Sequence, residues 1–125
     1  MDKQLYDAGM KVRREVLGAD YVDKQVAAAD DFTRPMQYLV TEYCWGAAWT
    51  RPGLDRRQRS MLNLGMLIAL NRSNEFKTHV RAAITNGLGK QDILEVILHA
   101  TIYCGVPAGF EATRLAKEVF KELAI

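Results

Sequence analysis

Apolar positions recur along most of the chain at the three- and four-residue spacing of a helix, and no stretch sustains the alternation of a strand. The first segment with this period covers residues 3–17 and ends at Gly18, and a shorter one follows over residues 20–29. A third helix is predicted to begin around Pro35, since proline is tolerated in a first turn, and to run to about Trp45.

The second half of the chain continues the helical pattern. Residues 50–53, Thr-Arg-Pro-Gly, predict a turn, because proline presets one backbone dihedral and glycine accepts the conformation that other residues avoid. Asp55 is then the expected N-cap of a helix that reaches about Leu70.

Three further segments complete the chain. Ser73 opens a helix that Gly87 is expected to end in a left-handed conformation. Another helix is predicted over residues 91–103, and the last, after a break at residues 105–107, runs to about position 123. We therefore expect an all-α fold, a compact bundle of six to seven helices in a single domain over residues 1–125.

Composition narrows the class of protein. A chain of 125 residues that is 49% apolar has the size of one domain with a modest core, so subunit contacts are expected to add stability. The net charge of +2 is too mild to indicate a nucleic-acid partner, but it suits a small anionic substrate. The apolar run over residues 61–70 is too short to cross a membrane, so no membrane partner is expected.

The cysteines and the N-terminus indicate the compartment. Cys44 and Cys104 are far apart and lack the spacing of a metal or redox motif, which argues against a disulfide scaffold. We predict that both are small residues of the core. The N-terminal segment lacks the apolar stretch of a secretory signal, and a cytoplasmic location is expected.

Glu75 and His79 are the most informative pair for chemistry. Residues four apart on a helix share a face, so the carboxylate can orient the imidazole or stabilise its protonated, charged form. Such a histidine can donate or accept a proton near neutral pH. The alternative is an ordinary pair on the surface of a helix.

Glu95 and His99 have the same spacing. Two such pairs raise the idea of a metal site in a helical bundle, but di-iron bundles use Glu-x-x-His together with two further glutamates. His99 lies in an apolar stretch over residues 93–102, so a hydrogen-bonded histidine in the core is the simpler interpretation. No metal site is predicted.

The segment around the two tryptophans has the composition of a pocket. Trp45 and Trp49 share a helix face and flank small residues, Glu42 precedes them, and Arg51 follows just beyond the helix. Aromatic walls, a carboxylate and an arginine suit a flat anionic molecule. The alternative is that both tryptophans are anchors of the core.

Arginines gather next to this segment. Arg56, Arg57 and Arg59 follow Arg51 closely, and arginine holds carboxylates through paired hydrogen bonds. A solvated helix start is the expected role of at least two of the four. A basic nucleic-acid patch is a third interpretation, weakened by the lack of an accompanying motif.

Together these segments resemble the 4-carboxymuconolactone decarboxylase family. The resemblance spans nearly the whole chain, and its motifs are GMKVRREVLG at 9–18, WGAAWTRPGLDRRQRS at 45–60, EFKTHVR at 75–81 and YCGVPA at 103–108. This family is similar in fold to alkyl hydroperoxidase D, whose peroxidase site is Cys-x-x-Cys-x-x-x-His. Aligned on His79, that pattern places Arg72 and Glu75 at the cysteine positions, so a thiol peroxidase activity is not expected.

The resemblance implies a reaction and an assembly. It implies that 4-carboxymuconolactone loses carbon dioxide to give 3-oxoadipate enol-lactone, in the protocatechuate branch of the 3-oxoadipate pathway of aromatic breakdown. No cofactor is expected, because the conjugated lactone carbonyl of the substrate accepts the electrons. A homo-oligomer, a trimer or a hexamer, is also implied.

The resemblance also supports particular roles for these residues. His79 is expected to donate the proton or to donate a hydrogen bond to the lactone oxygen, Glu75 to orient it, and Glu42 to be a second acid–base candidate. The substrate-binding candidates are three arginines and three aromatic residues: Arg51, Arg56, Arg59, Trp45, Trp49 and Tyr103. Two alternatives stay open, namely a related enzyme acting on another lactone or a peroxide, and a non-catalytic helical interaction module.

Overall fold

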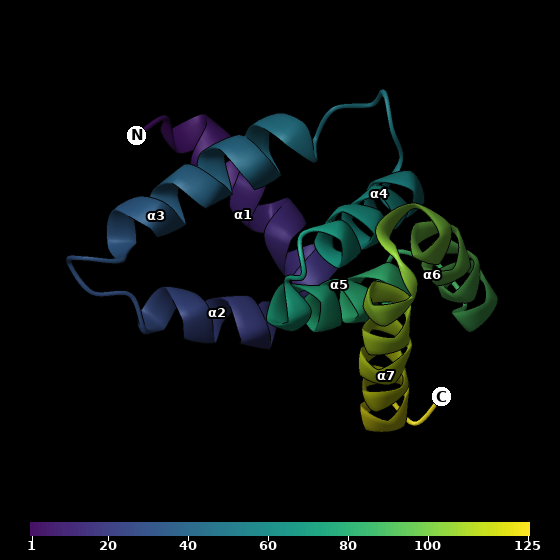
Figure 1. Cartoon of the computed structure of the whole chain (residues 1–125). Coiled ribbons are helices and arrows are strands. Elements are labelled where there is room, and N and C mark those ends of the chain that lie inside the picture. Colours follow the sequence, from purple (N-terminus) through teal and green to yellow (C-terminus); the bar gives the residue numbers. More distant parts are fainter. The chain divides into compact units, whose positions relative to one another are not determined.

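Every regular element of the computed structural model, which describes residues 1–125, is helical (Figure 1). The elements in order are α1 (Lys3–Leu17), α2 (Ala19–Ala27), α3 (Arg34–Leu39), η1 (Val40–Ala48), α4 (Arg56–Ala69), α5 (Ser73–Thr85), α6 (Lys90–Cys104) and α7 (Val106–Glu122). Because η1 continues α3 without a break, the chain has seven separate helical segments. This confirms the prediction of an all-α fold with six to seven helices.

Helix ends follow the signals in the sequence. The Asp2 carboxylate accepts a hydrogen bond from the backbone N–H of Leu5 at 3.1 Å and so caps α1. Gly18 and Gly87 have φ angles of 96° and 95°, a region in which other residues are strained, and both follow the last turn of a helix. The predicted ends at these two glycines are therefore confirmed.

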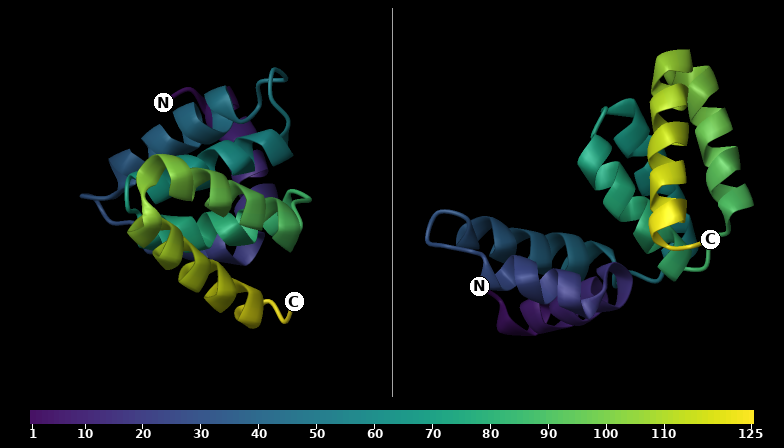
Figure 2. Two further views of the ribbon diagram at one scale, coloured as in Figure 1. Left: turned by 45° about the vertical axis from the view of Figure 1, so that its right-hand side comes forward. Right: turned by 90° about the horizontal axis from the view of Figure 1, so that it is seen from below.

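The chain forms two compact units, Met1–Asp55 and Arg56–Ile125. In the first, α1 packs against η1 and α2. In the second, α4 packs against α5 and α6, and α7 packs against the same two helices. Both views in Figure 2 show α6 and α7, green and yellow, side by side. The expectation of one domain over residues 1–125 stays a prediction.

The core of the second unit is formed by apolar side chains from all four of its helices. Its least exposed members are Leu64, Phe76, Val80, Ala83, Ile93 and Val119. This packing fixes which faces of α4 and α5 remain at the surface, where the candidate chemistry lies.

The third predicted helix runs further than expected and changes its type. It continues to Ala48, and from Val40 onward it is a π-helix, in which each N–H bonds to the carbonyl five residues earlier. The backbone N–H of Trp49 donates to the Cys44 carbonyl at 3.0 Å, in the same five-residue register. Apolar periodicity does not separate the two helix types, so this change could not be predicted from the spacing of apolar residues.

Three placements in the core were predicted wrongly. Cys44 and Cys104 are both exposed rather than buried. The buried positions of η1 are Thr41, Glu42, Trp45 and Gly46, and Cys44 is not among them. Cys104 is the last residue of α6. His99 is also exposed, because the buried stripe of α6 passes through Ile93, Ile97 and Ala100. No helix in the structure has both the length and the apolar character needed to cross a membrane.

Candidate functional site

His79 lies on α5 with its imidazole half-buried, and Glu75 stands one turn earlier on an exposed position. The side chain of Asn63 reaches this histidine from α4, with its amide nitrogen 3.5 Å from Nδ1 of the ring. The histidine therefore has a carboxylate on its own helix and an amide on the neighbouring helix. This is the part of the predicted site that the second unit brings together.

The surroundings of His79 define its protonation. Burial lowers the pKa of His79 below its ordinary value, and the negative charge of Glu75 offsets only part of that effect. The imidazole is accordingly neutral at neutral pH. The amide nitrogen of Asn63 faces Nδ1, and a hydrogen bond between them requires Nδ1 to accept and the ring proton to reside on Nε2.

Two of the candidate arginines share a face of α4 with Asn63. Arg56, Arg59 and Asn63 are spaced three and four residues apart, and both arginines are half-buried. Arg57 points elsewhere, since its guanidinium donates to the Gly87 carbonyl and lies 3.5 Å from an Asp92 carboxylate oxygen. Arg57 therefore has a structural contact, where the sequence analysis expected a solvated helix start for at least two of the four arginines.

The two tryptophans form a close pair on η1. Their ring centroids are 4.8 Å apart with planes tilted by 31°, and only 4% of Trp45 and 8% of Trp49 is exposed. The pair is consistent with the core-anchor interpretation, and a wall for a substrate ring stays a prediction. Arg51 lies in the exposed turn that follows η1.

Glu42 has a structural hydrogen bond. Its side chain is buried, and Oε1 accepts from the backbone N–H of Asp2 at 2.8 Å. The structure therefore gives this carboxylate a backbone partner at the N-terminal end of α1. A role for Glu42 in acid–base chemistry stays a prediction.

Tyr103 belongs to a different part of the second unit. An open, mainly apolar groove of about 840 Å³ runs between α4 and α6, and Tyr103 lines it together with His99. Their ring centroids are 4.9 Å apart. Neither His79 nor Asn63 lines this groove. The structure therefore separates Tyr103 from the histidine with which the sequence grouped it.

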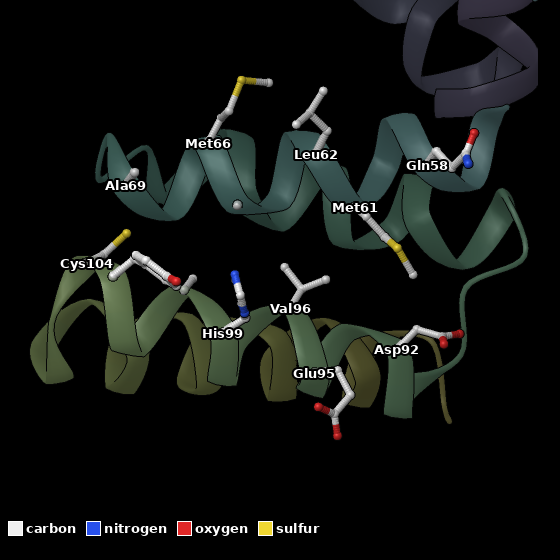
Figure 3. A pocket seen from close by; sticks show the side chains of 13 residues that line it. Gln58, Met61, Leu62, Met66, Ala69, Asp92, Glu95, Val96, His99 and Cys104 are labelled. Atoms are coloured by element: carbon white, nitrogen blue, oxygen red, sulfur yellow. The ribbon is translucent and has the colours of Figure 1, made fainter. Parts of the chain in front are cut away.

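Figure 3 shows why the second Glu–His pair differs from the first. His99 and Val96 point from α6 toward α4, and Met61 points from α4 toward α6, whereas Glu95, which also lines the groove, turns its carboxylate away from α4. The two side chains of this pair therefore point in different directions. The structure has no group of three or more His, Cys, Asp or Glu side chains placed to hold a metal ion.

Asn63 is the functional candidate that the sequence analysis missed. The available signal was its position as a polar residue within the apolar run over residues 61–70. A polar side chain inside such a run is either satisfied in the core or directed at a site. Only the packing of α4 against α5 shows that it faces His79.

Known proteins support the same family. Residues 34–118 match the model of the carboxymuconolactone decarboxylase family. The chain is 44% identical over 123 residues to a nitrosuccinic acid decarboxylase of Metarhizium robertsii, which covers 98% of this chain and 86% of that protein. It is 41% identical over 124 residues to a 4-carboxymuconolactone decarboxylase of Acinetobacter baylyi, which covers 99% of this chain and 92% of that protein. On this evidence, and with the all-helical fold, the chain belongs to the carboxymuconolactone decarboxylase family.

Proposed function

We propose that this protein is a carboxy-lyase that decarboxylates a small dicarboxylate without a cofactor, with 4-carboxymuconolactone as the first candidate substrate. The observation that carries the proposal is His79, half-buried, with its pKa lowered by burial and with Nδ1 facing the amide nitrogen of Asn63. We assign the ring proton to Nε2, because the amide nitrogen can only donate to Nδ1. Such a ring is a ready hydrogen-bond donor for an oxygen that becomes negative during the reaction.

The chemistry of the substrate explains why a hydrogen-bond donor is enough. When the bond between the ring carbon and the carboxylate breaks, carbon dioxide leaves and the electron pair flows through the conjugated C=C bond to the lactone carbonyl oxygen. The resulting dienolate then takes up a proton at a ring carbon. Donors aimed at such an oxyanion stabilise the transition state by about 3–4 kcal/mol each.

This assignment chooses between the two roles that the sequence left open for His79. A neutral imidazole donates a hydrogen bond readily, whereas giving up its Nε2 proton would leave a strongly basic anion. We therefore favour His79 as the donor to the developing oxyanion, with Glu75 as the residue that orients it. The proton that reaches the ring carbon comes from another acid, for which Glu42 remains a candidate.

Arginines are the proposed holders of the substrate carboxylates. Arg56 and Arg59 share the α4 face of Asn63, which favours them for the anion that accompanies His79. Arg51 keeps its predicted role in carboxylate binding, and Trp45 and Trp49 keep theirs as walls for the substrate ring. Tyr103 is the weakest of these candidates, because it lies in the α4–α6 groove with His99.

Nitrosuccinate is the second candidate substrate, and the relative in Metarhizium robertsii favours it. Nitrosuccinate is also a dicarboxylate with its electron acceptor built in, because the nitro group stands next to a carboxylate and can take up the electron pair. One arrangement of arginines and an oxyanion donor would therefore serve either compound. A related lactone, a peroxide or a purely structural role is less well supported, since none of these accounts for both relatives.

A direct assay separates these possibilities. The purified protein is mixed with 4-carboxymuconolactone or with nitrosuccinate, and loss of the lactone absorbance and release of carbon dioxide are followed. We expect turnover of at least one of the two, strongly reduced in the His79→Gln variant. A folded protein that releases no carbon dioxide from either compound would contradict the proposal and favour an interaction module.

We also propose that the protein acts as a homo-oligomer, a trimer or a hexamer, in the cytoplasm. Large apolar side chains stay exposed where α6 ends and α7 begins, among them Ile102 at 81% and Phe110 at 73%. An apolar surface of this kind marks a protein contact. Light scattering should show a mass well above the 14.1 kDa of one chain, and Ile102→Asp should lower it. A wild-type monomer at micromolar concentration would contradict this.

A further inference from the structure

Arg13 spans the point at which the third helical segment changes from α to π. Its Nη1 atom donates to the side-chain oxygen of Gln37 at 2.8 Å and to the hydroxyl of Thr41 at 3.1 Å. Gln37 lies in α3 and Thr41 is the second residue of η1, so one guanidinium nitrogen holds side chains on both sides of the transition.

Arg13 is also an unusual residue to bury. Only 4% of it is exposed, and its Nε has no hydrogen-bond partner. Burial lowers the pKa of its guanidinium, and the groups that counteract this are the side chains of Tyr21, Tyr6 and Cys44 rather than a carboxylate. Burying a cation without a charged partner destabilises a fold, and an apolar residue of similar size is often at least as stable. Stability alone therefore does not explain an arginine at this position.

A second contact from α1 meets η1 within the same wide turn. Gly9 is one turn before Arg13, and a Cβ at Gly9 would collide with the Thr41 carbonyl and lie 2.7 Å from the backbone nitrogen of Gly46. Thr41 and Gly46 are five residues apart in the sequence, and this is the separation of the residues that a π-helical hydrogen bond joins. The absence of a side chain at Gly9 thus lets α1 approach this turn of η1. Arg13 donates a hydrogen bond to the Thr41 hydroxyl in the same turn.

From these contacts we infer that Arg13 is a positioning residue, which fixes the π-helical register of η1 and thereby the relative orientation of Trp45 and Trp49. A return to α-helical bonding would rotate every later side chain of η1 about the helix axis. Residues four apart share a face of an α-helix as well, so Trp49 would stay near Trp45, but the angle between the two rings would change. The consequence for catalysis rests on the proposed function, in which the two tryptophans wall the substrate ring.

The test uses the tryptophan pair as its own reporter. Two indoles with centroids 4.8 Å apart couple electronically and give a paired signal in circular dichroism, which the Trp49→Phe variant identifies by its loss. Arg13→Met keeps much of the apolar bulk and removes the donors. We expect it to stay helical but to change the sign or shape of the coupled signal, and to lower kcat/KM by up to about a hundredfold through misplacement of the ring wall.

Arg14→Met is the matched control. Arg14 is the next residue on α1, but it is exposed and pairs with Asp23 on the surface at 3.0 Å. This variant should keep both the coupled signal and the activity. Thr41→Val removes the accepting hydroxyl at nearly constant shape, and it should change the coupled signal in the same way as Arg13→Met. It decides the question if Arg13→Met does not fold.

The result that overturns the inference is a folded Arg13→Met protein, or a folded Thr41→Val protein in its place, with an unchanged coupled signal. Lost activity with an unchanged signal overturns it too, because Arg13 would then act by another route. The spectroscopic comparison needs no substrate. If the wild-type protein turns over neither candidate compound, the proposed function fails while the positioning role is still decided.

Discussion

The amide nitrogen of Asn63 on α4 lies 3.5 Å from Nδ1 of His79 on α5. This contact joins the only polar position inside an otherwise apolar helical stretch to a histidine whose pKa burial lowers. When Asn63 donates to Nδ1, Nε2 is the protonated nitrogen of the neutral ring, and so the atom available to a substrate.

Replacing His79 by glutamine should lower kcat by about a hundred- to thousandfold, the usual cost of removing one donor to an oxyanion, with a smaller change in KM. Glu75→Gln should cost less if Glu75 only orients the ring. Because the two residues act together, the double variant should be little worse than His79→Gln alone. Steady-state kinetics on variants with wild-type circular dichroism measure this. Near-normal turnover of folded His79→Gln would move attention to Glu42.

Replacing Asn63 by aspartate should reverse the roles of the ring nitrogens. A carboxylate would accept a hydrogen bond from Nδ1–H, raise the pKa of His79 and leave Nε2 of the neutral ring without its hydrogen. We expect kcat to fall by about ten- to a hundredfold, the range found for partners that orient a functional histidine. Nitrogen NMR of the imidazole reports the tautomer directly. Asn63→Leu, which imposes no tautomer, is the control and should cost less.

The free energy of unfolding should depend on pH through His79. Its pKa is lowered in the folded chain, while the unfolded chain has the ordinary value of 6.5, so between these values the unfolded state binds more protons. The stabilisation is complete above pH 6.5 and is lost as the pH falls toward the folded-state pKa. Urea unfolding from pH 7.5 down to pH 5 should therefore show a shallower decline for His79→Gln than for the wild type. Equal declines would mean that the ring titrates alike in both states.

Removal of metal ions should leave the activity unchanged. The proposed substrates carry their own electron acceptors, and the proposed reaction uses only side chains of the protein. The assay is repeated after exhaustive dialysis against a strong chelator, with and without added zinc, manganese or magnesium. Activity that disappears and returns with one of these metals would refute the cofactor-independent mechanism.

Substitution of both cysteines by serine should leave decarboxylation largely intact. Cys44 and Cys104 are exposed and lack a redox partner, so neither is expected to take part in the chemistry. Kinetics of the double variant measure this, with circular dichroism as the check on folding. A large loss of turnover in a folded double variant would show that the thiol of Cys44, next to Trp45, has a role that we have not assigned.

The sequence by itself determined the helical elements and the family. Glycines at positions 18, 87 and 105 mark helix ends because each has a positive φ that other residues avoid, and such local preferences need no tertiary context. The spacing of Glu75 and His79 likewise places them on one face of any helix that contains them. The fold class and the main catalytic candidate could therefore be predicted from local rules.

Only the tertiary structure decided which face of each helix is covered and which side chains of different helices meet. The cysteines and His99 were assigned to the core because apolar neighbours surround them in sequence, yet their helices turn other residues inward. Asn63 and His79 are 16 positions apart, and Arg13 and Thr41 are 28 apart. No local pattern encodes such contacts, because they depend on how two helices pack after each has formed. The same holds for the π-helix η1. It packs closely against α1, and the spacing of apolar residues does not reveal it.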